Sequence, residues 1–411
     1  MAREASFPRP IQRLLAERAG YRCSVPFCSK PTVGPGARAH ESANVGTACH
    51  IYSASVGGPR GTGGLSATER QQEENGIWCC AYHGRLIDTN RGDRYPAELL
   101  KHWKELHKAR TEREMAGFAT QLGWVHELEI INSVLFRPSS KLQFSKATLI
   151  YGDGPVGKST ICEWLAGISL PSALARWKKH DHDLRLSYFA PEAETILLSI
   201  TKKEVHRSLN GKRLLKSPAN LRVLYLPEDH PRRFRREPGT DDLSWIAGVL
   251  DSEPETIKGL CDDIRIDGHA FCRHMEFRDE HAAPNEEEDE PGRDGCYLYV
   301  AADTDPTKKL PLAALATSEE IAVIVQFAAA LARTQARHTP TLLVLDAGGW
   351  NWCDSLFDYF APYFAEQPYQ VVLARAEVPK SFGNDVWAGW SAVQLERGKN
   401  RGDNTITEVL R

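Results

Sequence analysis

One stretch of the sequence decides the fold of most of the chain: Thr148-Leu149-Ile150-Tyr151-Gly152-Asp153-Gly154-Pro155-Val156-Gly157-Lys158-Ser159-Thr160-Ile161-Cys162-Glu163-Trp164-Leu165. The apolar residues at 148–151 predict a buried strand, and those after Ser159 predict a helix. Between them, residues 152–159 match the pattern G-x4-G-K-S without a departure. Glycines let the backbone curl so that its N–H groups point at phosphate oxygens, and the helix N-terminus adds partial positive charge. This order of strand, loop and helix predicts a phosphate-binding P-loop.

The P-loop pattern assigns the residues of a nucleotide site. Lys158 is expected to reach the β- and γ-phosphates, and the Ser159 hydroxyl is expected to ligate Mg²⁺. Asp346 ends the apolar run 342–345 in the manner of a Walker B strand and is expected to supply the second metal contact. We therefore predict a site for ATP with Mg²⁺ that is formed by Gly152, Gly154, Gly157, Lys158, Ser159, Thr160 and Asp346.

The composition and the apolar pattern of the sequence change near residue 117. From about Trp124, apolar runs alternate with helical stretches such as Ser318–Arg333, which is the pattern of an α/β layered domain. Before residue 117 the chain is rich in glycine and cysteine and reads as a small, loop-rich α+β module. We predict two domains, a metal-stapled module at 1–116 and a P-loop α/β domain at 125–411, joined by a linker at 117–124.

The composition of the 411 residues excludes several classes of protein. Hydrophobic residues make up 42% of the chain and charged residues 26%, as is usual for a globular protein. No run of about 18 uncharged apolar residues occurs, so no membrane helix is expected, and no apolar signal segment follows the N-terminus. We expect a soluble, cytoplasmic protein whose cysteines are metal ligands or buried thiols.

Charge is unevenly distributed between the two domains. Residues 1–115 hold 17 Lys and Arg against 12 Asp and Glu, whereas the whole chain has a net charge of −3. A basic small domain joined to an acidic larger one is compatible with a nucleic-acid partner for the small domain. An excess of this size is also common on surfaces that bind no nucleic acid.

Two pairs of residues in the first domain have the spacing of zinc ligands. Cys23 and Cys28 form one pair, and Cys80 and His83 form the other. Four such ligands close a tetrahedral Zn²⁺ site and stabilise a module that is too small for a large core. We predict one structural zinc ion, with free buried cysteines as the alternative.

Around these pairs, over about residues 10–110, the sequence resembles the HNH endonucleases. The motifs that carry the resemblance are Cys49-His50-Ile51, Asn75-Gly76-Ile77-Trp78-Cys79-Cys80-Ala81-Tyr82-His83 and Ile87-Asp88. The resemblance implies a ββα-metal fold that hydrolyses DNA, expected to be double-stranded, with one divalent ion, Mg²⁺ or Mn²⁺. It makes His50 the general base that takes a proton from the attacking water, and Asn75 the residue that holds the His50 loop by hydrogen bonds.

The metal ligands depart from the commoner family pattern C-x2-C-H, in which the histidine binds the catalytic metal. Here His83 stands at the place of the second cysteine, and Gly84 at the place of that histidine. Asp88 lies one helical turn further on and is the candidate to present a carboxylate instead. Alternatively, His83 serves the catalytic metal and Cys49 or Cys79 completes the zinc site. We favour the assignment of His83 to zinc.

Upstream of the Walker B strand, Leu315-Ala316-Thr317-Ser318-Glu319-Glu320 opens a predicted long helix. Here the chain, over about residues 125–400, resembles the ABC-type ATPases of chromosome maintenance and recombination repair. In that family the signature sequence of one subunit closes over the nucleotide of another. The resemblance therefore implies an ATP-dependent homodimer or higher oligomer, formed through the P-loop domain.

Two departures from that family bear on hydrolysis. Its signature serine, a contact to the γ-phosphate, is Ala316 here, and the glutamate that follows the Walker B aspartate is Ala347. Asp354 and Glu377 are candidate substitutes, although their spacing does not require it. Since an alanine neither orients a water nor donates to a phosphate oxygen, we predict that bound ATP acts as a switch more than as a fuel.

Together these features predict a metal-dependent DNA endonuclease that is regulated by an ATP-binding, ABC-like domain. Fusions of this kind resemble prokaryotic defence effectors against phage or plasmid DNA, and the resemblance leaves room for a companion subunit. A first alternative is a non-catalytic DNA-binding protein with an ATP-dependent clamp or assembly domain. A second is a P-loop enzyme that acts on a small molecule and uses the zinc module as a scaffold.

Overall fold

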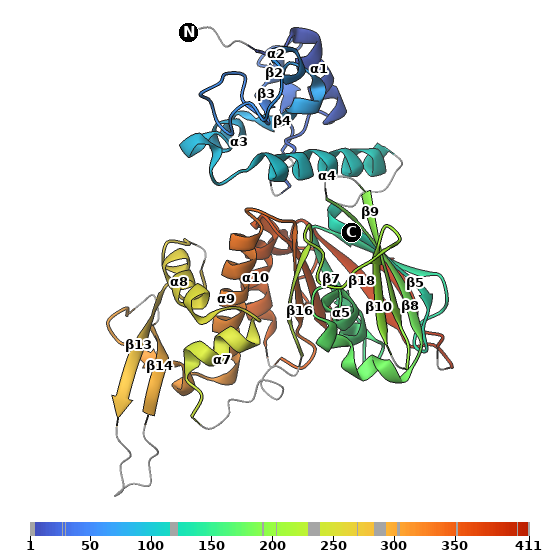
Figure 1. Cartoon of the computed structure of the whole chain (residues 1–411), viewed down its shortest axis with the longest axis vertical. Helices are drawn as coiled ribbons and strands as arrows, with labels where there is room; N and C mark the ends of the chain where they lie inside the picture. Colours follow the sequence, from blue (N-terminus) through green and yellow to red (C-terminus); the bar gives the residue numbers. More distant parts are fainter. Residues whose placement is uncertain are drawn as a thin grey trace, which may run out of the picture.

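The computed structural model describes residues 5–26, 28, 30–115, 122–190, 193–202, 204–228, 239–268, 270–282, 293–301, 305–350, 352–400 and 402–409. A small N-terminal module and a larger domain are seen in Figure 1, and helix α4 (Ala97–Met115) runs between them.

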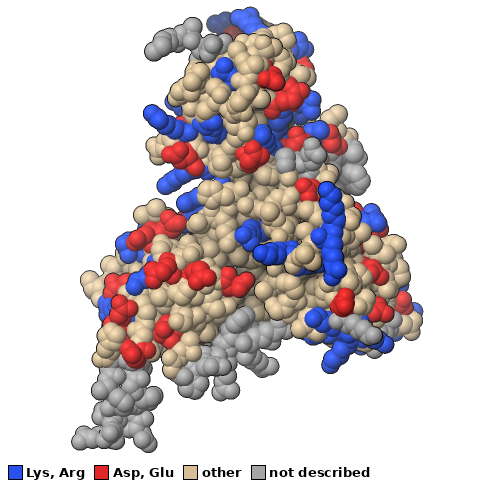
Figure 2. Space-filling view, viewed as in Figure 1, with Lys and Arg blue, Asp and Glu red and all other residues tan. Residues whose placement is uncertain are grey.

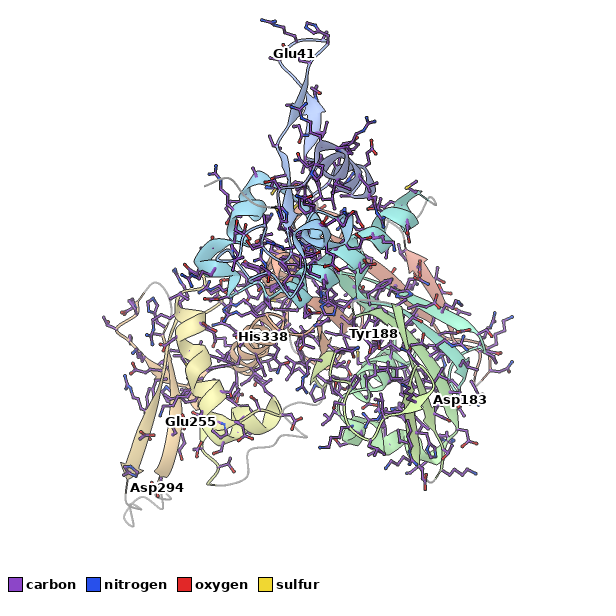
Figure 3. All side chains as sticks on the ribbon, turned by 45° about the horizontal axis from the view of Figure 1, so that its top comes forward. Glu41, Asp183, Tyr188, Glu255, Asp294 and His338 are labelled. Atoms are coloured by element: carbon purple, nitrogen blue, oxygen red, sulfur yellow. The ribbon has the colours of Figure 1, made fainter. Side chains whose placement is uncertain are left out.

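The N-terminal module is built on a two-stranded antiparallel pair, β3 (Gly46–His50) and β4 (Gly76–Cys80), and helix α3 (Ala81–Leu86) follows β4 directly. The hairpin of β1 and β2 projects from the module, with Glu41 near its tip (Figure 3). The core side chains are almost fully buried and include Ile51, Ile77, Ile87, Leu100 and Trp103. The remaining elements are α1 (Arg9–Arg18), β1 (Val33–Pro35), β2 (Ser42–Asn44), α2 (Ala67–Arg70), η1 (Glu73–Asn75) and η2 (Thr89–Gly92).

Helix α4 belongs to the module and also packs on the larger domain. It contacts strand β5 (Leu122–Asn132), where the ring of Trp124 meets that of His102 edge-on at 5.8 Å between centroids. Trp124 is 2% exposed and lies in the core of the N-terminal module. Of the predicted linker at 117–124, residues 122–124 lie in β5, and the earlier part, 117–121, lies outside the described residues.

The larger domain is centred on a six-stranded sheet in the order β12-β16-β17-β7-β18-β19. Neighbouring strands pair in parallel except β18 and β19. The carboxyl ends of the parallel strands, where ligands of such sheets bind, therefore meet at one edge. The strands are β12 (Arg222–Leu226), β16 (Thr341–Asp346), β17 (Gln370–Arg375), β7 (Ala147–Tyr151), β18 (Trp390–Glu396) and β19 (Thr405–Val409).

Both faces of this sheet are covered. Leu343 and Leu345 pack in one layer with helices α9 (Thr317–Gln335) and α10 (Asp354–Glu366). Leu342 and Val344 pack in the opposite layer with helix α5 (Lys158–Ala166). Burial on both faces explains why the strands appear in the sequence as continuous apolar runs.

A second, antiparallel sheet in the order β11-β10-β9-β8-β5-β6 shares its core with α5. Its other strands are β6 (Ser140–Ser145), β8 (His182–Phe189), β9 (Ala193–Ile200), β10 (Val205–Leu209) and β11 (Lys212–Arg213). A lobe of helices and a three-stranded sheet lies next to α9, on the side away from β16 (Figure 1). The lobe contains α7 (Asp242–Val249), α8 (Pro254–Arg265), β13 (His274–Ala282), β14 (Arg293–Ala301) and β15 (Leu310–Pro311). Short 3₁₀ segments complete the chain: η3 (Pro171–Lys179), η4 (Leu312–Ala314) and η5 (Asp385–Trp387).

The mixed α/β fold predicted for the larger domain is confirmed. The helix expected at Ser318–Arg333 spans Thr317–Gln335, and the apolar runs at 148–151 and 342–345 lie in β7 and β16. The acidic tract at 284–292 lies outside the described residues. Among the helices that the structure describes, none is both long and apolar enough to cross a membrane.

Candidate nucleotide site, metal centre and cleft

The P-loop joins the central strand β7 to helix α5, as its sequence predicts. Gly154 and Gly157 have φ angles of +66° and +103°, which residues other than glycine rarely adopt. A Cβ at Gly152 would lie 2.3 Å from the carbonyl oxygen of Leu395, so the loop needs glycine there for space. The loop borders a cavity of about 530 Å³, lined among others by Gly154, Gly157, Lys158, Ser159 and Thr160.

The side chain of Lys158 folds back over the P-loop, where its ammonium is expected to meet the phosphates. Its Nζ donates to the carbonyl oxygens of Gly152 at 2.5 Å and Gly154 at 2.9 Å. Burial lowers the pKa of Lys158, and the carboxylates of Glu228 and Asp346 oppose this shift. These contacts keep the ammonium at the mouth of the loop, within reach of an arriving phosphate oxygen.

Asp346 ends strand β16 beside the P-loop and is 1% exposed. Neither of its carboxylate oxygens has a hydrogen-bond partner among the described residues. Burial raises its pKa to about 7, the hydroxyl of Ser159 opposes this shift, and repulsion from Glu228 adds to it. A buried carboxylate without partners is unfavourable unless a cation or donor compensates it. Its position therefore fits Mg²⁺ brought in with a nucleotide, together with the hydroxyl of Ser159.

Glu228 is a third acidic group at this site, and the motifs of the sequence did not identify it. It follows β12 by two residues, lines the P-loop cavity, and accepts a hydrogen bond from Ser159 Oγ at 2.9 Å. The signal in the sequence was an apolar strand that ends in Leu226-Pro227-Glu228, one strand before the Walker B strand in the sheet order.

The two carboxylates suggested as substitutes for Ala347 lie elsewhere. Asp354 begins helix α10, where Oδ1 accepts from Arg375 Nη2 at 3.1 Å and Oδ2 accepts from the backbone N of Lys380 at 3.4 Å. Glu377 is exposed beyond the end of β17. Neither residue lines the P-loop cavity, whereas Glu228 does. The carboxylate of Asp354 thus already accepts hydrogen bonds from Arg375 and Lys380.

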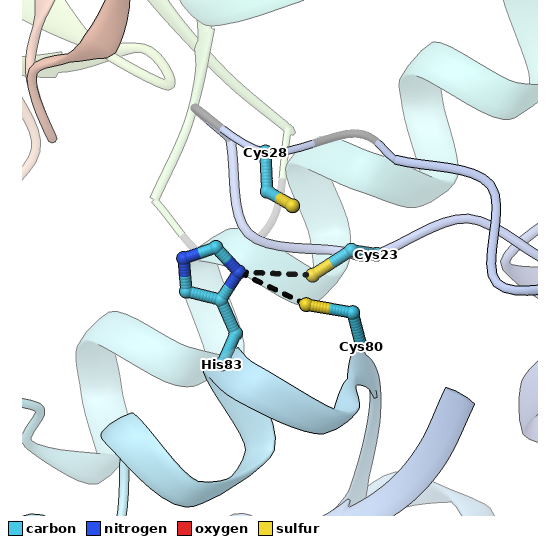
Figure 4. Close-up of side chains that lie close together, drawn as sticks. All are labelled: Cys23, Cys28, Cys80 and His83. Carbon is cyan, nitrogen blue, oxygen red and sulfur yellow. Dashed lines mark hydrogen bonds between the residues drawn. The ribbon is translucent and has the colours of Figure 1, made fainter. Parts of the chain in front are cut away.

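The four predicted zinc ligands converge at one point of the N-terminal module (Figure 4). Cys23 and Cys28 come from the segment after α1, Cys80 ends β4, and His83 lies in α3. Their ligand atoms all lie within 4.8 Å of one another, and His83 Nδ1 lies 3.7 Å from Cys23 Sγ and 3.3 Å from Cys80 Sγ. Hydrogen bonds from Cys28 and Cys79 lower the pKa of the Cys23 thiol to about 4.

This donor set fits a tetrahedral Zn²⁺ site, because three sulfurs and one imidazole nitrogen are ligands that zinc prefers. His83 faces the cysteines, as the favoured assignment requires. Cys49 and Cys79 are buried next to the group without belonging to it, and Cys49 Sγ lies 3.8 Å from the carbonyl oxygen of Thr47.

His50 ends strand β3, and two residues near the N-terminus, Ala5 and Phe7, hold its ring. Its Nε2 lies 2.8 Å from the carbonyl oxygen of Ala5, and its ring stacks on Phe7 with centroids 3.8 Å apart. A carbonyl oxygen can only accept a hydrogen bond, so Nε2 carries a proton and Nδ1 is the basic nitrogen of the neutral ring.

Asn75 is 4% exposed and ties down the loop that follows His50. Its Oδ1 accepts from the backbone N of Tyr52 at 2.8 Å, and its Nδ2 donates to the carbonyl oxygens of Tyr52 at 2.9 Å and Arg70 at 3.1 Å. The side chain thus makes the contacts with the His50 loop that its suggested role requires.

Asp88 shares a cleft of about 700 Å³ with His50, but it is paired with Arg60. Arg60 Nη2 donates to Asp88 Oδ1 at 2.5 Å, and the Arg60 side chain is 5% exposed. The same guanidinium donates to the carbonyl oxygens of Ile51, Ile87 and His50 at 2.6, 2.6 and 3.1 Å.

A second, catalytic metal does not fit this cleft well. Among the described residues, the only group of three or more His, Cys, Asp or Glu side chains close enough to hold an ion is the Cys23 set. Of the His, Cys, Asp and Glu side chains, Cys49, His50 and Asp88 line the cleft, and Asp88 is paired with Arg60. Asp88, which is predicted to replace the missing histidine as a metal ligand, forms an ion pair with Arg60, and its role as a ligand stays a prediction.

No protein-family model matches the chain, and no curated protein matches its sequence. Among solved structures, an SMC head bound to the C-terminal winged-helix domain of ScpA is 14% identical, with a TM-score of 0.47 over 70% of this chain and 97% of that one. The SMC head domain from Thermotoga maritima is 14% identical, with a TM-score of 0.40 over 70% of this chain and 99% of that one. The recombination mediator RecF with ATP is 11% identical, with a TM-score of 0.43 and the same coverage.

Proposed function

We propose that the protein is a nucleic-acid endonuclease whose N-terminal HNH-like module cuts a phosphodiester and whose P-loop domain, an ABC-like ATPase domain, binds ATP. The observation that carries the nuclease half is the state of His50. Its ring is fixed by Ala5 and Phe7, and its basic nitrogen in the neutral form is Nδ1. An imidazole near neutral pH suits proton abstraction from an attacking water.

Positive charge on both sides of His50 supports DNA as the substrate. His50 lines the cleft that contains the exposed Arg85, and it also lines a neighbouring cavity of about 640 Å³ that contains the exposed Arg9 and Arg13. Lys and Arg side chains are prominent on the N-terminal module in Figure 2. A double-stranded phosphate backbone laid across His50 would meet exposed arginines on either side, and such contacts dominate the affinity of proteins for DNA.

The zinc ion would be held by Cys23, Cys28, Cys80 and His83 and would fix the loop after α1 to the start of α3. This is a structural role, because all four protein ligands are used and no coordination position remains open. Zinc would thereby stabilise the strand pair that carries His50, without taking part in the reaction.

ATP would bind at the P-loop with Mg²⁺ between Ser159 and Asp346. By the same proposal, the start of α9 at Ala316 faces the nucleotide of a second copy, so that ATP joins two chains and brings two His50 clefts to one duplex. A role in prokaryotic defence against phage or plasmid DNA is proposed for this pairing of modules, and a companion subunit remains compatible with it.

The second candidate is a DNA-binding protein that does not cut. The ion pair of Arg60 and Asp88 favours it, because that pair occupies the acid that a catalytic metal would need. In this case the zinc module would grip DNA while the P-loop domain clamps or assembles on it.

A plasmid-cleavage experiment separates the two candidates. The parent protein and His50→Ala are incubated with supercoiled plasmid in EDTA, Mg²⁺ or Mn²⁺, and His40→Ala, which changes an exposed histidine on the hairpin, is the control. The nuclease proposal expects cleavage by the parent and by His40→Ala, and a loss of at least about 10²-fold in His50→Ala. Equal DNA binding by all three proteins with no cleavage in any metal supports the second candidate.

A further inference from the structure

Ala347 leaves a gap in the machinery that a P-loop hydrolase requires. It directly follows Asp346, it is 3% exposed, and its methyl group can neither hold nor polarise water. Hydrolysis of ATP requires a group that orients the attacking water in line with the γ-phosphorus. The neighbouring strand, β12, supplies an acid at the corresponding position.

The register of the sheet brings the ends of β12 and β16 side by side. Strands β12 and β16 run parallel, and Leu226 pairs with Leu345 at the end of the ladder. Two further residues along each strand lead to Glu228 and Ala347. Both chains leave the sheet at its carboxyl edge, and Glu228, two residues beyond β12, lines the P-loop cavity there.

The loop after β16 is shaped around the Glu228 side chain. A Cβ on Gly348 would lie 3.0 Å from Glu228 Oε1 and 3.9 Å from Asp346 Oδ1. A Cβ on Gly349 would lie 2.9 Å from Glu228 Cγ. Two consecutive glycines thus leave room for the carboxylate beside Asp346, where any other residue would crowd it.

Two hydrogen bonds hold Glu228 at the P-loop. Ser159 Oγ donates to Glu228 Oε2 at 2.9 Å, and the indole nitrogen of Trp350 donates to the carbonyl oxygen of Pro227 at 3.4 Å. Trp350 is 6% exposed, so the backbone just before Glu228 is anchored to the core. The carboxylate therefore comes from a fixed backbone position and faces the cavity in which the phosphates would lie.

We propose that Glu228 is the catalytic carboxylate of this site and that the protein hydrolyses ATP. In the step, the oxygen of a water held by Glu228 bonds to the γ-phosphorus. The bond between that phosphorus and the β,γ-bridging oxygen breaks, and its electron pair leaves with ADP. The water proton passes to the Glu228 carboxylate and from there to solvent. Ser159, now hydrogen-bonded to Glu228, would hold the metal that accompanies the nucleotide.

This inference rests on the nucleotide site of the proposed function and is independent of DNA cleavage. A glutamate in this position has two other uses, as a metal ligand or as a structural partner of Ser159. Loss of a metal ligand weakens binding of ATP·Mg²⁺, and loss of a structural partner affects the fold. Loss of a water-positioning group slows hydrolysis and leaves ATP binding intact.

The test measures nucleotide binding and phosphate release on the full-length protein, with and without linear duplex DNA. Binding is followed with a fluorescent ATP analogue and Mg²⁺, and release with a coupled phosphate assay. The variants are Glu228→Gln, which keeps the shape and an acceptor for Ser159, and Glu377→Gln as the matched control at an exposed glutamate. Lys158→Ala marks the absence of bound nucleotide.

We expect Glu228→Gln to bind the analogue within about threefold of the parent and to release phosphate at least about 10²-fold more slowly. Glu377→Gln should behave as the parent. The inference is overturned if the parent binds nucleotide without hydrolysing it under either condition, if Glu228→Gln hydrolyses at the parental rate, or if its main defect is in binding. Failure of the parent to bind nucleotide would instead overturn the proposed function of the P-loop domain.

Discussion

Arg60 and Asp88 form an ion pair at 2.5 Å that joins the loop after His50 to the end of α3. The guanidinium also donates hydrogen bonds to three backbone carbonyl oxygens, so Arg60 stabilises the cleft by more than its ion pair with Asp88. Arg60→Met would remove this donor from three partly buried acceptors. We expect the module to lose roughly 3 kcal/mol of stability, since unsatisfied buried acceptors cost about 1–3 kcal/mol each and relaxation recovers part of that.

Hydrogen exchange of residues 46–92 in Arg60→Met and Asp88→Asn measures this effect. Asp88→Asn should be much milder, because the Asp88 side chain is 45% exposed and its amide oxygen still accepts from Arg60. Equal loss of protection in the two variants would show that the carbonyl contacts of Arg60 contribute little.

Removal of one proposed zinc ligand should unfold the N-terminal module. We expect the purified protein to contain about one zinc per chain and Cys23→Ser to contain almost none, because the free energy of zinc binding is folding free energy of such a module. Nucleotide binding by the P-loop domain should persist. Metal analysis and circular dichroism provide the measurements, with Cys353→Ser, at an exposed cysteine, as the control. A folded module without zinc in the parent protein would contradict the assignment.

Asn75→Ala should slow cleavage without abolishing DNA binding. The change removes the two hydrogen bonds that fix both backbone groups of Tyr52, two residues beyond His50. A histidine loop displaced by about 1 Å is expected to cost on the order of 10²-fold in rate. Cleavage rate and DNA affinity are measured together. A variant that loses affinity and rate in equal proportion would indicate general unfolding of the module.

Lys146 should make the stability of the larger domain depend on pH. Burial lowers its pKa from 10.5 to about 7, and its Nζ donates to the carbonyl oxygen of Ala365 at 2.6 Å. Between pH 7 and 10 the unfolded chain therefore binds more protons than the native one, and the free energy of unfolding rises with pH.

The expected contribution to the slope is at most about 1.4 kcal/mol per pH unit. Lys146→Met should remove that part of the slope and stabilise the protein most at pH 7. Urea unfolding of the parent, Lys146→Met and the exposed control Lys141→Met at pH 7, 8 and 9 tests it. Parallel curves for the parent and Lys146→Met would show that the native lysine is charged.

The parts of the sites that were predictable from the sequence are those encoded locally. The P-loop is contiguous, and each Cys or Cys/His pair of the proposed zinc site spans a few residues, so the spacing alone indicates these groups. The helix at Thr317–Gln335 and the strand before Asp346 were likewise visible as uninterrupted apolar patterns.

The parts that were missed depend on contacts between distant residues. Glu228 lies 69 residues beyond Ser159, and its position follows from β12 being the neighbour of β16, which no motif encodes. Arg60 lies 28 residues before Asp88, and the carbonyl of Ala5 that fixes His50 is 45 residues away from it. The pattern showed Asp88 one turn beyond Gly84 but could not show that a buried arginine would meet it.

Lys158→Ala should abolish nucleotide binding and every property that depends on it. In the free protein Lys158 holds the P-loop by two carbonyl contacts, and in the complex its charge is expected to move to the phosphates. Loss of one charge-assisted contact costs about 1.5–3 kcal/mol and weakens the affinity roughly 10–150-fold, so the variant should be almost empty at a nucleotide concentration that half-saturates the parent. Light scattering with ATP should then find dimers for the parent and, more persistently, for Glu228→Gln, but monomers for Lys158→Ala. Lys141→Ala, at an exposed lysine of the same domain, should dimerise like the parent. If ATP leaves the mass of Glu228→Gln at that of a monomer while the nucleotide is bound, pairing of the P-loop domains is not the means by which ATP controls this protein.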